Sequence, residues 1–374
     1  MARALPGALY PIRYAGVVEA EGPCAAVEQS FRQRLRYESA PQTIAFHPGR
    51  WVLDLRFGAL LKYREDAWRP RSGTLYHPYR PGEDAYVAEV NGVLPRALER
   101  GRVIELGAEQ GRWNVPLLGR WSGVYFHLLA ESLTQLDLLE EAFGAAALRG
   151  IAPAEASAVQ RIGIEDAARR GIASATAPGR FAAIDGALLY SGLHRHAAIN
   201  DAFAVMAARL RARHAAADAP PGRPIYIARL AATARPLGNE AAVAALAESL
   251  GYEILDPSTL SFADQVRRFA ATRVVVGPHG SGLVNAAFCE AGSLLLELRP
   301  LNRAGQSPTL EDSYRRIAAV GRLFYDCAIF PNPPDTEAWQ VDLDRTARIL
   351  ERAASWTAPP EEPDGQAIRA FAGH

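Results

Sequence analysis

Lysine is almost absent from the chain, and so is any excess of charge. Lys62 is the one lysine, so arginine supplies the other 40 of the 41 basic residues, and 41 acidic residues balance them. A net charge of +0 gives no broad field that would hold nucleic acid or an anionic membrane over the whole surface. We therefore expect no nucleic-acid partner.

Cysteines and long apolar runs are also scarce. Cys24, Cys289 and Cys327 are odd in number and widely spaced, which argues against a disulfide framework or a zinc site and fits a reducing compartment. No apolar run reaches the roughly 18 residues of a membrane span, and the first residues lack the continuous apolar core of a secretion signal. The expected location is the cytoplasm.

The length of the chain favours two domains. At 374 residues it exceeds the roughly 250–300 residues at which single hydrophobic cores stop growing. With 49% hydrophobic and 22% charged residues, the composition is that of an ordinary globular protein. The pattern of elements places an N-terminal domain at residues 1–200, a second domain at 201–335, and a final helix with a tail at 336–374.

The segment 272–300 holds the densest chemistry in the chain. Residues 274–276 are apolar and β-branched on both faces, as in a strand buried in a parallel sheet, and Gly277-Pro278 is expected to end that strand. Gly280, Ser281 and Gly282 follow, just before a helix predicted at residues 283–289. Bare backbone N–H groups and the positive end of a helix dipole make such a turn a good anion site.

A second apolar strand, at residues 294–296, is expected to present Glu297 at its carboxyl end. A carboxylate in that place suits the hydroxyl pair of a ribose, so Glu297 and the glycine-rich turn together indicate a nucleotide diphosphate site. His279 and Ser281 should share the same rim of the sheet. The alternative is a tight turn without a ligand, because glycine-rich turns of this kind occur in many α/β domains.

Alternating strands and helices lead up to this segment and predict a doubly wound parallel sheet. The expected elements are strands at 225–228 and 253–255 and helices at 239–250 and 261–270. Ser261 is expected to cap the second helix. Arg229 then lies at the carboxyl end of its strand, on the same rim as His279, and Arg235 follows after a short loop. A guanidinium in this place can bind two phosphate oxygens at once.

The N-terminal part offers a second pair of candidate side chains, on a helix that Ser122 is expected to cap. His127 and Glu131 lie four residues apart, so an imidazole and a carboxylate share one helix face. Taken alone, an ordinary ion pair on a solvated face explains this pair better than catalysis does. His194 and His196 have the H-x-H spacing of metal ligands, but no third ligand lies near them in the sequence, and no metal site is predicted.

Residues 10–112 are rich in proline, glycine, arginine and aromatic residues, and we expect short strands and loops there. Residues 51–55 and 86–90 alternate in the manner of strands. His47 is predicted to lie in a turn, because Pro48 and Gly49 follow it. The aromatic and basic side chains at residues 76–80 either contact a sugar or pack on their own domain.

In combination these elements resemble the family 61 glycosyltransferases. That family has a strand ending in arginine, an R-x-x-N-E element, a helix beginning with Gln-Val, and a G-x-H-G-[AS]-G-L-x-N-x-x-F loop followed by a strand with Glu. The corresponding residues here are Arg229, then Arg235 with Asn239 and Glu240, then Gln265-Val266, and finally residues 277–288 with Glu297. An upstream Y-x-H-x-x-x-[DE] helix is matched by Tyr125, His127 and Glu131. The resemblance covers roughly residues 120–300; three residues separate Arg235 from Asn239 where many members of the family have two.

The resemblance implies an α/β fold of the GT-B type, in which two Rossmann-like domains face each other across a cleft. It implies an inverting hexosyl- or pentosyltransferase that moves a sugar from a nucleotide-sugar donor, with UDP as the expected nucleotide, to a glycan acceptor. The expected process is the biosynthesis of bacterial surface polysaccharide, such as capsule or lipopolysaccharide, in the cytoplasm or in peripheral association with the inner membrane face. Residues 1–200 then form the acceptor-side domain, in which Glu131 or His127 supplies the catalytic base, and residues 201–335 form the nucleotide-sugar-binding domain.

The same resemblance implies which residues bind the donor nucleotide. They are Arg229, Arg235, His279, Gly280, Ser281, Gly282 and Glu297, with Asn239, Glu240 and Asn285 as supporting residues. We expect no required metal, because arginine and a helix N-terminus can offset the charge of a diphosphate and no Asp-x-Asp motif lies near the loop. Two other functions stay open: a sugar-nucleotide-binding protein that has lost catalysis, and a dinucleotide-dependent oxidoreductase. No pattern in the sequence indicates an oligomeric state.

Overall fold

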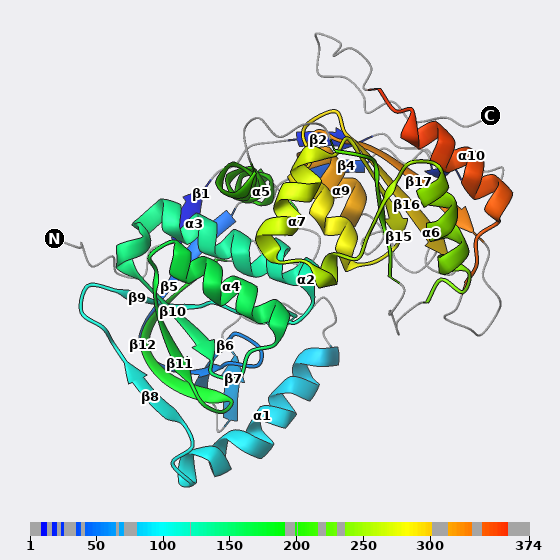
Figure 1. Ribbon diagram of the computed structural model, residues 1–374. Coiled ribbons are helices and arrows are strands. Elements are labelled where there is room, and N and C mark those ends of the chain that lie inside the picture. The colour runs from blue at the N-terminus through cyan, green and yellow to red at the C-terminus, as the bar shows by residue number, and fades with distance from the viewer. Residues whose placement is uncertain are drawn as a thin grey trace. The chain divides into compact units, whose positions relative to one another are not determined.

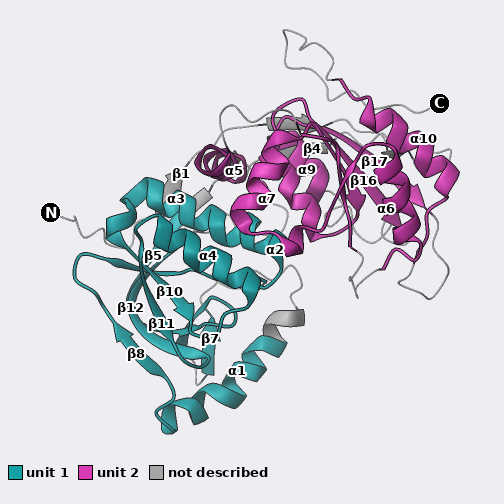
Figure 2. Ribbon diagram, in the orientation of Figure 1, with its two compact units in different colours: residues 1–15, 39–198 teal, residues 16–38, 199–374 magenta. Residues whose placement is uncertain are grey.

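The structure is a computed structural model, shown in Figure 1. It describes residues 9–12, 17–20, 24–25, 35–38, 42–64, 67–70, 81–119, 121–190, 199, 201–215, 222–229, 236–300, 313–330 and 339–357. The chain divides into two compact units (Figure 2): unit 1 comprises residues 1–15 and 39–198, and unit 2 comprises residues 16–38 and 199–374. Among the described residues, no helix is both long enough and apolar enough to cross a membrane.

Unit 1 is built on a nine-stranded mixed sheet. The main path runs β11-β10-β9-β12-β5-β6-β7, while β1 pairs with β5 and β8 pairs with β12. The strands are β1 (Leu9–Ile12), β5 (Gln42–Asp54), β6 (Ala59–Arg64), β7 (Ala67–Pro70), β8 (Ile104–Gly107), β9 (Trp113–Pro116), β10 (Leu148–Pro153), β11 (Ala173–Ala177) and β12 (Phe181–Tyr190). Strand β10 is parallel to β9 and β11, whereas β5, β6 and β7 pair antiparallel. This pairing differs from the all-parallel sheet of a Rossmann-like domain.

The helices of unit 1 include α1 (Pro81–Glu99), which covers one face of strand β5. The others are α2 (Tyr125–His127), α3 (Thr134–Phe143) and α4 (Ala158–Arg169), with a π-helical segment η1 (Leu128–Leu133) between α2 and α3 and a 3-10 turn η2 (Ala145–Ala147) after α3. Trp51 and Leu53 enter one hydrophobic cluster, while Val52, which points the opposite way, enters a second cluster that α1 covers.

Two local predictions for unit 1 are wrong. Residues 86–90 lie in helix α1, where Tyr86, Val90 and Leu94 are buried at a spacing of four residues against the sheet. His47 lies within β5 and is buried, with its ring edge-on to Trp51, so it is not a turn residue. The strand predicted at residues 51–55 is confirmed as the final part of β5. Residues 76–80 lie outside the described part of the chain.

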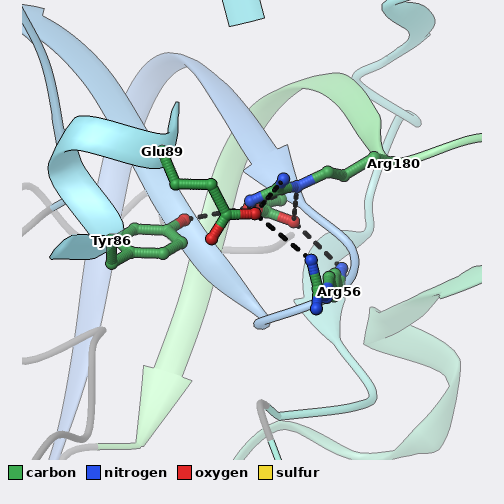
Figure 3. Close-up of polar contacts among 5 residues, drawn as sticks. Arg56, Tyr86, Glu89 and Arg180 are labelled. Carbon is green, nitrogen blue, oxygen red and sulfur yellow. Dashed lines mark hydrogen bonds and ion pairs between the residues drawn. The ribbon is translucent and has the colours of Figure 1, made fainter. Parts of the chain in front are cut away.

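A buried polar network fixes α1 to the sheet (Figure 3). Asp54, at the end of β5, is fully buried and accepts hydrogen bonds from Nη2 of Arg180 at 2.8 Å and from the hydroxyl of Tyr86 at 3.1 Å. Glu89 on α1 pairs with Nη1 of Arg180 at 2.7 Å and with Arg56 at 3.2 Å. Burial and the adjacent Asp54 raise the pKa of Tyr86, so its hydroxyl stays protonated as a donor. The network joins α1, β5 and the start of β12.

Unit 2 holds a six-stranded sheet in the order β14-β13-β15-β16-β17-β3, and each pair of neighbours in it is parallel. The strands are β3 (Cys24–Ala25), β13 (Ile225–Ile227), β14 (Glu253–Leu255), β15 (Val274–Pro278), β16 (Leu294–Pro300) and β17 (Phe324–Phe330). A separate antiparallel pair consists of β2 (Val17–Ala20) and β4 (Leu35–Glu38). Every residue of β15 and β16 is buried, as expected of a parallel sheet covered on both faces. The predicted α/β class with a parallel sheet is confirmed.

The helical elements of unit 2 follow the predicted alternation. They are α5 (Asp201–His214), α6 (Glu240–Ser249), η3 (Pro257–Thr259), α7 (Phe262–Ala271), η4 (Ser281–Phe288), α9 (Ser313–Val320) and α10 (Leu343–Ala354). Helices α6 and α10 pack against each other and share a cluster with Val274, Val276 and Leu296 of the strands. Ser261 caps α7 as predicted, since its hydroxyl accepts from the N–H of Asp264 at 3.1 Å.

Two boundaries near the candidate site differ from the prediction. Strand β15 includes Gly277 and Pro278, and β16 continues to Pro300, so Glu297 lies inside its strand rather than after it. The pairing continues because the N–H of His279 donates to the carbonyl of Leu298 at 2.8 Å. The helical segment η4 is a 3-10 helix that begins at Ser281, not an α-helix that begins at residue 283.

Candidate functional site

The candidate site of unit 2 lies where the strand order of its sheet reverses. The chain passes from β13 to β14 on one side and then returns to form β15 on the other side of β13. In doubly wound sheets, ligands bind beyond the carboxyl ends of the strands at this switch point. Here the two carboxyl ends carry Arg229 after β13 and His279 with Gly280 after β15.

Arg229 is held at three points. Its backbone N–H donates to Oε1 of Glu240, and its Nη1 donates to the carbonyl oxygen of His279 at 2.7 Å. Its guanidinium also lies against Gly280, where a Cβ would come within 2.8 Å of Cζ and Nε. A side chain at residue 280 would therefore displace the arginine.

The other glycines of the turn allow it to pack on the end of β13. A Cβ at Gly277 would lie 2.9 Å from Cβ of Ile227, and one at Gly282 would lie 3.1 Å from Cγ2 of Ile227. Ser281 opens η4, and the first N–H groups of a helical segment have no partner within it. The predicted juxtaposition of a cation and a glycine-rich turn is thus present, although the segment after the turn is a 3-10 helix and not the α-helix expected there.

His279 is buttressed by two buried side chains from the next strands. Its Nδ1 is hydrogen-bonded to Oε1 of Glu297, and Oε2 of Glu297 accepts from the hydroxyl of Tyr325 at 2.6 Å. The Glu297 side chain is 0% exposed, whereas 19% of the His279 side chain is exposed. The ring of His279 also meets Tyr314 edge-on at 5.4 Å. Tyr314 and Tyr325 were not singled out from the sequence; the apolar run at residues 324–330 would have indicated the strand that carries Tyr325.

Glu240 supports the backbone beneath the site. It lies in the first turn of α6 and is buried, and it accepts the N–H of Arg229. Burial raises the pKa of Glu240 above its usual value, while the N–H and the charge of Arg229 oppose that rise. The carboxylate therefore fixes the chain direction where β13 ends.

Asn239 and Asn285 hold the fold together around the site. Asn239 donates to the carbonyl oxygen of Val341 at 2.8 Å and accepts its N–H at 3.2 Å, which ties the start of α6 to the segment before α10. Asn285 is fully buried on η4 and donates to Oε1 of Gln265 on α7 at 3.0 Å. Asn285 and Gln265, which both belong to the family motifs, thus contact each other although they lie 20 positions apart in the sequence.

The candidate dyad of unit 1 is formed as the helical spacing predicts. Nδ1 of His127 lies 2.7 Å from Oε1 of Glu131, and the side chains are 19% and 10% exposed. Glu131 lies in the π-helical segment η1, and such segments occur frequently at functional sites. The ring centroids of Trp121 and His127 lie 6.1 Å apart.

Ser122 does not cap this helix as predicted. Val124 occupies the N-cap position of α2, without a side-chain cap. Ser122 instead donates to the carbonyl oxygen of Gly119 at 2.7 Å and accepts from Nε2 of Gln160 at 3.1 Å. The residue therefore ties the turn before α2 to α4.

Three candidates from the sequence lie outside the described residues: Arg235, His194 and His196. Within the described part of the chain, no group of three or more His, Cys, Asp or Glu side chains is arranged to hold a metal ion.

Comparison with known proteins gives one family match, and the matched segment contains residues of both candidate sites. The Glycosyltransferase 61 family model matches residues 125–296. This span begins on α2, beside His127, and includes Arg229 and the glycine-rich turn. No curated protein matches the chain. The match over residues 125–296 thus supports the family that the motifs predicted.

Proposed function

We propose that this protein is an inverting glycosyltransferase that moves a sugar from a nucleotide-sugar donor to a hydroxyl group of a glycan acceptor. Membership of the family implies a sugar donor and an acceptor. The nucleotide-sugar part is supported by one observation above all: the guanidinium of Arg229 is seated on Gly280 at the switch point of the parallel sheet, next to the start of η4. A cation beside bare backbone N–H groups suits a diphosphate.

The same groups would stabilise the leaving nucleoside diphosphate. Negative charge develops on the phosphate oxygens as the bond to the sugar breaks, and fixed donors aimed at that charge lower the barrier. The guanidinium of Arg229 supplies positive charge for this purpose. We therefore propose that the reaction requires no divalent metal, and that UDP is the first nucleotide to test.

The base in this proposal is the dyad of His127 and Glu131. An ionised carboxylate only accepts hydrogen bonds, so Nδ1 of His127 carries the proton in the 2.7 Å contact and Nε2 keeps its lone pair. That nitrogen takes the proton of the acceptor hydroxyl as its oxygen forms the bond to the anomeric carbon. The nucleoside diphosphate leaves with the electron pair of the broken bond, and attack from the opposite side inverts the anomeric centre.

Each unit has a separate task in this proposal. Unit 2 binds the donor, while unit 1 supplies the base and binds the acceptor, which is the division of labour in GT-B enzymes whose two domains face each other across a cleft. The process that we propose is bacterial surface polysaccharide biosynthesis on the cytoplasmic side of the inner membrane, as in capsule or lipopolysaccharide assembly.

The first test is a binding screen followed by a release assay. The melting temperature is measured with UDP, GDP, ADP, dTDP, CMP and NAD, and the sugar nucleotides of any stabilising nucleotide are then assayed for nucleotide release with and without glycan acceptors. We expect a nucleoside phosphate to stabilise the protein and its sugar nucleotide to be consumed. Stabilisation by NAD alone would indicate an oxidoreductase, and binding without release or transfer would indicate an inactive binding protein.

The replacement Arg229→Lys tests the phosphate contact directly. Lysine keeps the charge but loses the planar fork, so binding of the nucleoside diphosphate should weaken by about 1–3 kcal/mol while the nucleoside binds as before. The matched control is Arg267→Lys, since Arg267 lies on α7 with 49% of its side chain exposed and pairs only with the nearby Asp264 among the described residues. An equal loss for nucleoside and diphosphate would contradict the assignment.

A further inference from the structure

Three adjacent strands of unit 2 bring a histidine, a glutamate and a tyrosine into one line of hydrogen bonds. His279 follows β15, Glu297 lies on β16 and Tyr325 lies on β17. Tyr325 and Glu297 are 4% and 0% exposed, and the exposed end of the line is the imidazole. The line therefore runs from the interior of the sheet to the rim where Arg229 lies.

Both carboxylate oxygens of Glu297 take part in hydrogen bonds within the protein. One of its oxygens contacts Nδ1 of His279, and the other accepts from the hydroxyl of Tyr325 at 2.6 Å. Burial by itself raises the pKa of Glu297, but the charges of His279 and Arg299 and these two hydrogen bonds outweigh it and hold the pKa below its usual value. An ionised, buried carboxylate with both oxygens occupied is poorly placed to hold the hydroxyl pair of a ribose, which is the role that the sequence suggested.

The contacts fix the orientation of the imidazole. An ionised carboxylate accepts but cannot donate, so Nδ1 of His279 carries a proton. Nε2 has no hydrogen-bond partner among the described residues and is the nitrogen left to a ligand. In the doubly protonated ring both nitrogens are donors, so Nδ1 can stay on Glu297 while Nε2 donates to a phosphate oxygen. The backbone is held as well, because the N–H of His279 donates to Leu298 and its carbonyl oxygen accepts from Arg229 at 2.7 Å. The ring and the guanidinium are thus anchored to each other at the same rim.

The same contacts also fit a purely structural role of the three residues. Buried carboxylates need hydrogen-bond donors, and Tyr325 and His279 could serve Glu297 for the stability of the sheet alone. In that case the three residues would affect folding, and their replacement would not discriminate between ligands that contain phosphate and ligands that lack it.

We propose that Glu297 and Tyr325 are positioning residues that hold His279 with Nε2 directed at the diphosphate of the donor, and that Glu297 does not bind the ribose. This inference rests on the proposed function, because it names the part of the donor that His279 contacts. His279 touches the substrate, whereas Glu297 and Tyr325 act through it. The same arrangement, in which a carboxylate fixes the tautomer of a histidine, is a general way to set which ring nitrogen meets a ligand.

The experiment uses Tyr325→Phe, which removes one hydroxyl and keeps the ring. UDP, or the diphosphate that replaces it in the screen, and its nucleoside are titrated by calorimetry into the full-length protein. We expect Tyr325→Phe to weaken the diphosphate about threefold to tenfold, the usual effect of one hydrogen bond, and to leave the nucleoside unchanged. The control is Tyr252→Phe, since this buried tyrosine of the same unit donates to the carbonyl oxygen of Leu350 at 2.8 Å.

A double-mutant cycle separates positioning from stability. If Tyr325 acts through His279, Tyr325→Phe should have no further effect on diphosphate affinity once His279→Ala is present. Additive losses, or an equal loss for nucleoside and diphosphate, would overturn the proposal. A wild-type protein that binds no nucleoside phosphate would instead overturn the proposed function, and the inference with it, so the two failures are distinguishable.

Nuclear magnetic resonance gives a readout that does not depend on binding. The chain has 8 histidines, and long-range proton–nitrogen correlation assigns the signals of His279 as those missing from His279→Ala. At a pH that keeps the imidazoles neutral, we expect the proton on Nδ1 in the wild type and a mixture of tautomers in Glu297→Gln, whose amide can donate as well as accept. In the neutral ring of the ligand-free wild type, a single proton on Nε2 instead of Nδ1 would overturn the proposal.

Discussion

The guanidinium of Arg229 lies against Gly280 so closely that a Cβ at residue 280 would sit 2.8 Å from both Cζ and Nε. The backbone of Gly280 is extended, with φ at 173°, so an alanine can adopt it. The glycine is therefore required by the approach of the arginine and not by its own conformation. Replacing it moves the arginine without removing its charge.

We expect Gly280→Ala to weaken nucleoside diphosphate binding by about 1–3 kcal/mol, similar to the loss of one charge-assisted hydrogen bond, and to leave the nucleoside unaffected. Calorimetric titration of both ligands measures this. The matched control is Gly92→Ala on the exposed face of α1, where no described atom lies within 4 Å of the new Cβ. That change should stabilise the helix by up to about 1 kcal/mol and leave binding unchanged. Unchanged diphosphate affinity in Gly280→Ala would contradict the phosphate role of Arg229.

Replacing a residue of the His127–Glu131 dyad should lower turnover. Removal of a general base typically costs about 10²-fold or more, so His127→Ala should lower the transfer rate by that factor while donor affinity is retained. Glu131→Gln should cost less, because the amide oxygen can still accept from Nδ1. Steady-state rates and donor titrations test both.

The control for the dyad is another pair at the same spacing. Glu165 and Arg169 are joined across one helical turn of α4 at 3.1 Å, with side chains 59% and 45% exposed. Glu165→Gln should change neither turnover nor donor affinity, since exposed pairs contribute little. If Glu131→Gln costs more turnover than His127→Ala, the carboxylate and not the imidazole is the base.

Transfer should proceed in excess EDTA. Enzymes that hold a diphosphate through a divalent ion lose activity when the ion is removed, whereas a guanidinium and backbone N–H groups are not removed by a chelator. The assay compares rates with EDTA and after addition of Mg²⁺ or Mn²⁺. Loss of activity that only the added ion restores would show the metal-free proposal to be wrong, and would direct attention to Glu240, Glu297, His194 and His196 as ligands.

The buried side chain of Asp326 should make the free energy of unfolding depend on pH. Burial raises its pKa to about 7, although the N–H of Cys327 and the charge of Arg352 lower it. Because the folded value lies above the unfolded one, the folded state binds the proton more tightly, and the free energy of unfolding falls as the pH rises from about 4 to about 7. Asp326→Asn keeps an acceptor for Cys327 and removes the charge.

Denaturant unfolding at several pH values tests this behaviour of Asp326. The variant should gain stability over the wild type as the pH rises through that window, by at most about 4 kcal/mol, and then keep a constant advantage above about pH 7. Equal stability of the two proteins near pH 8 would show that Asp326 titrates as an ordinary carboxyl group.

The sequence predicted most of the parallel sheet because its signals are local. The valine run of β15 and the serine cap at Ser261 each depend on residues a few positions apart. Helix α1 was missed for the opposite reason. Residues 86–90 alternate in the sequence as a strand does, but Ala88 is exposed between the buried Tyr86 and Val90, which fits the helical spacing of four residues and not a strand. This burial depends on how α1 packs on the sheet.

Side-chain partners from distant parts of the chain account for the remaining differences. Ser122 bonds to Gln160, a residue 38 positions later, and so leaves the cap position of α2 to Val124. Glu297 was read as the end of a short strand, but its position in the fold depends on Tyr325, 28 residues later, and on the extension of β16 to Pro300. Pairings of this kind carry no local pattern in the sequence. The spacing of His127 and Glu131 within one helix did predict their contact.

Strand β3 is synthesised long before β17, the strand with which it pairs. Residues 24 and 25 form the outer strand of the unit 2 sheet beside β17, whose residues are made about 300 positions later. During translation this strand has no partner until the rest of the sheet has emerged from the ribosome. A chain that starts just after residue 25 would leave β17 as an open edge, a template for pairing with other chains. Shortening the protein from its N-terminus is therefore expected to cause aggregation before it affects the residues of either candidate site.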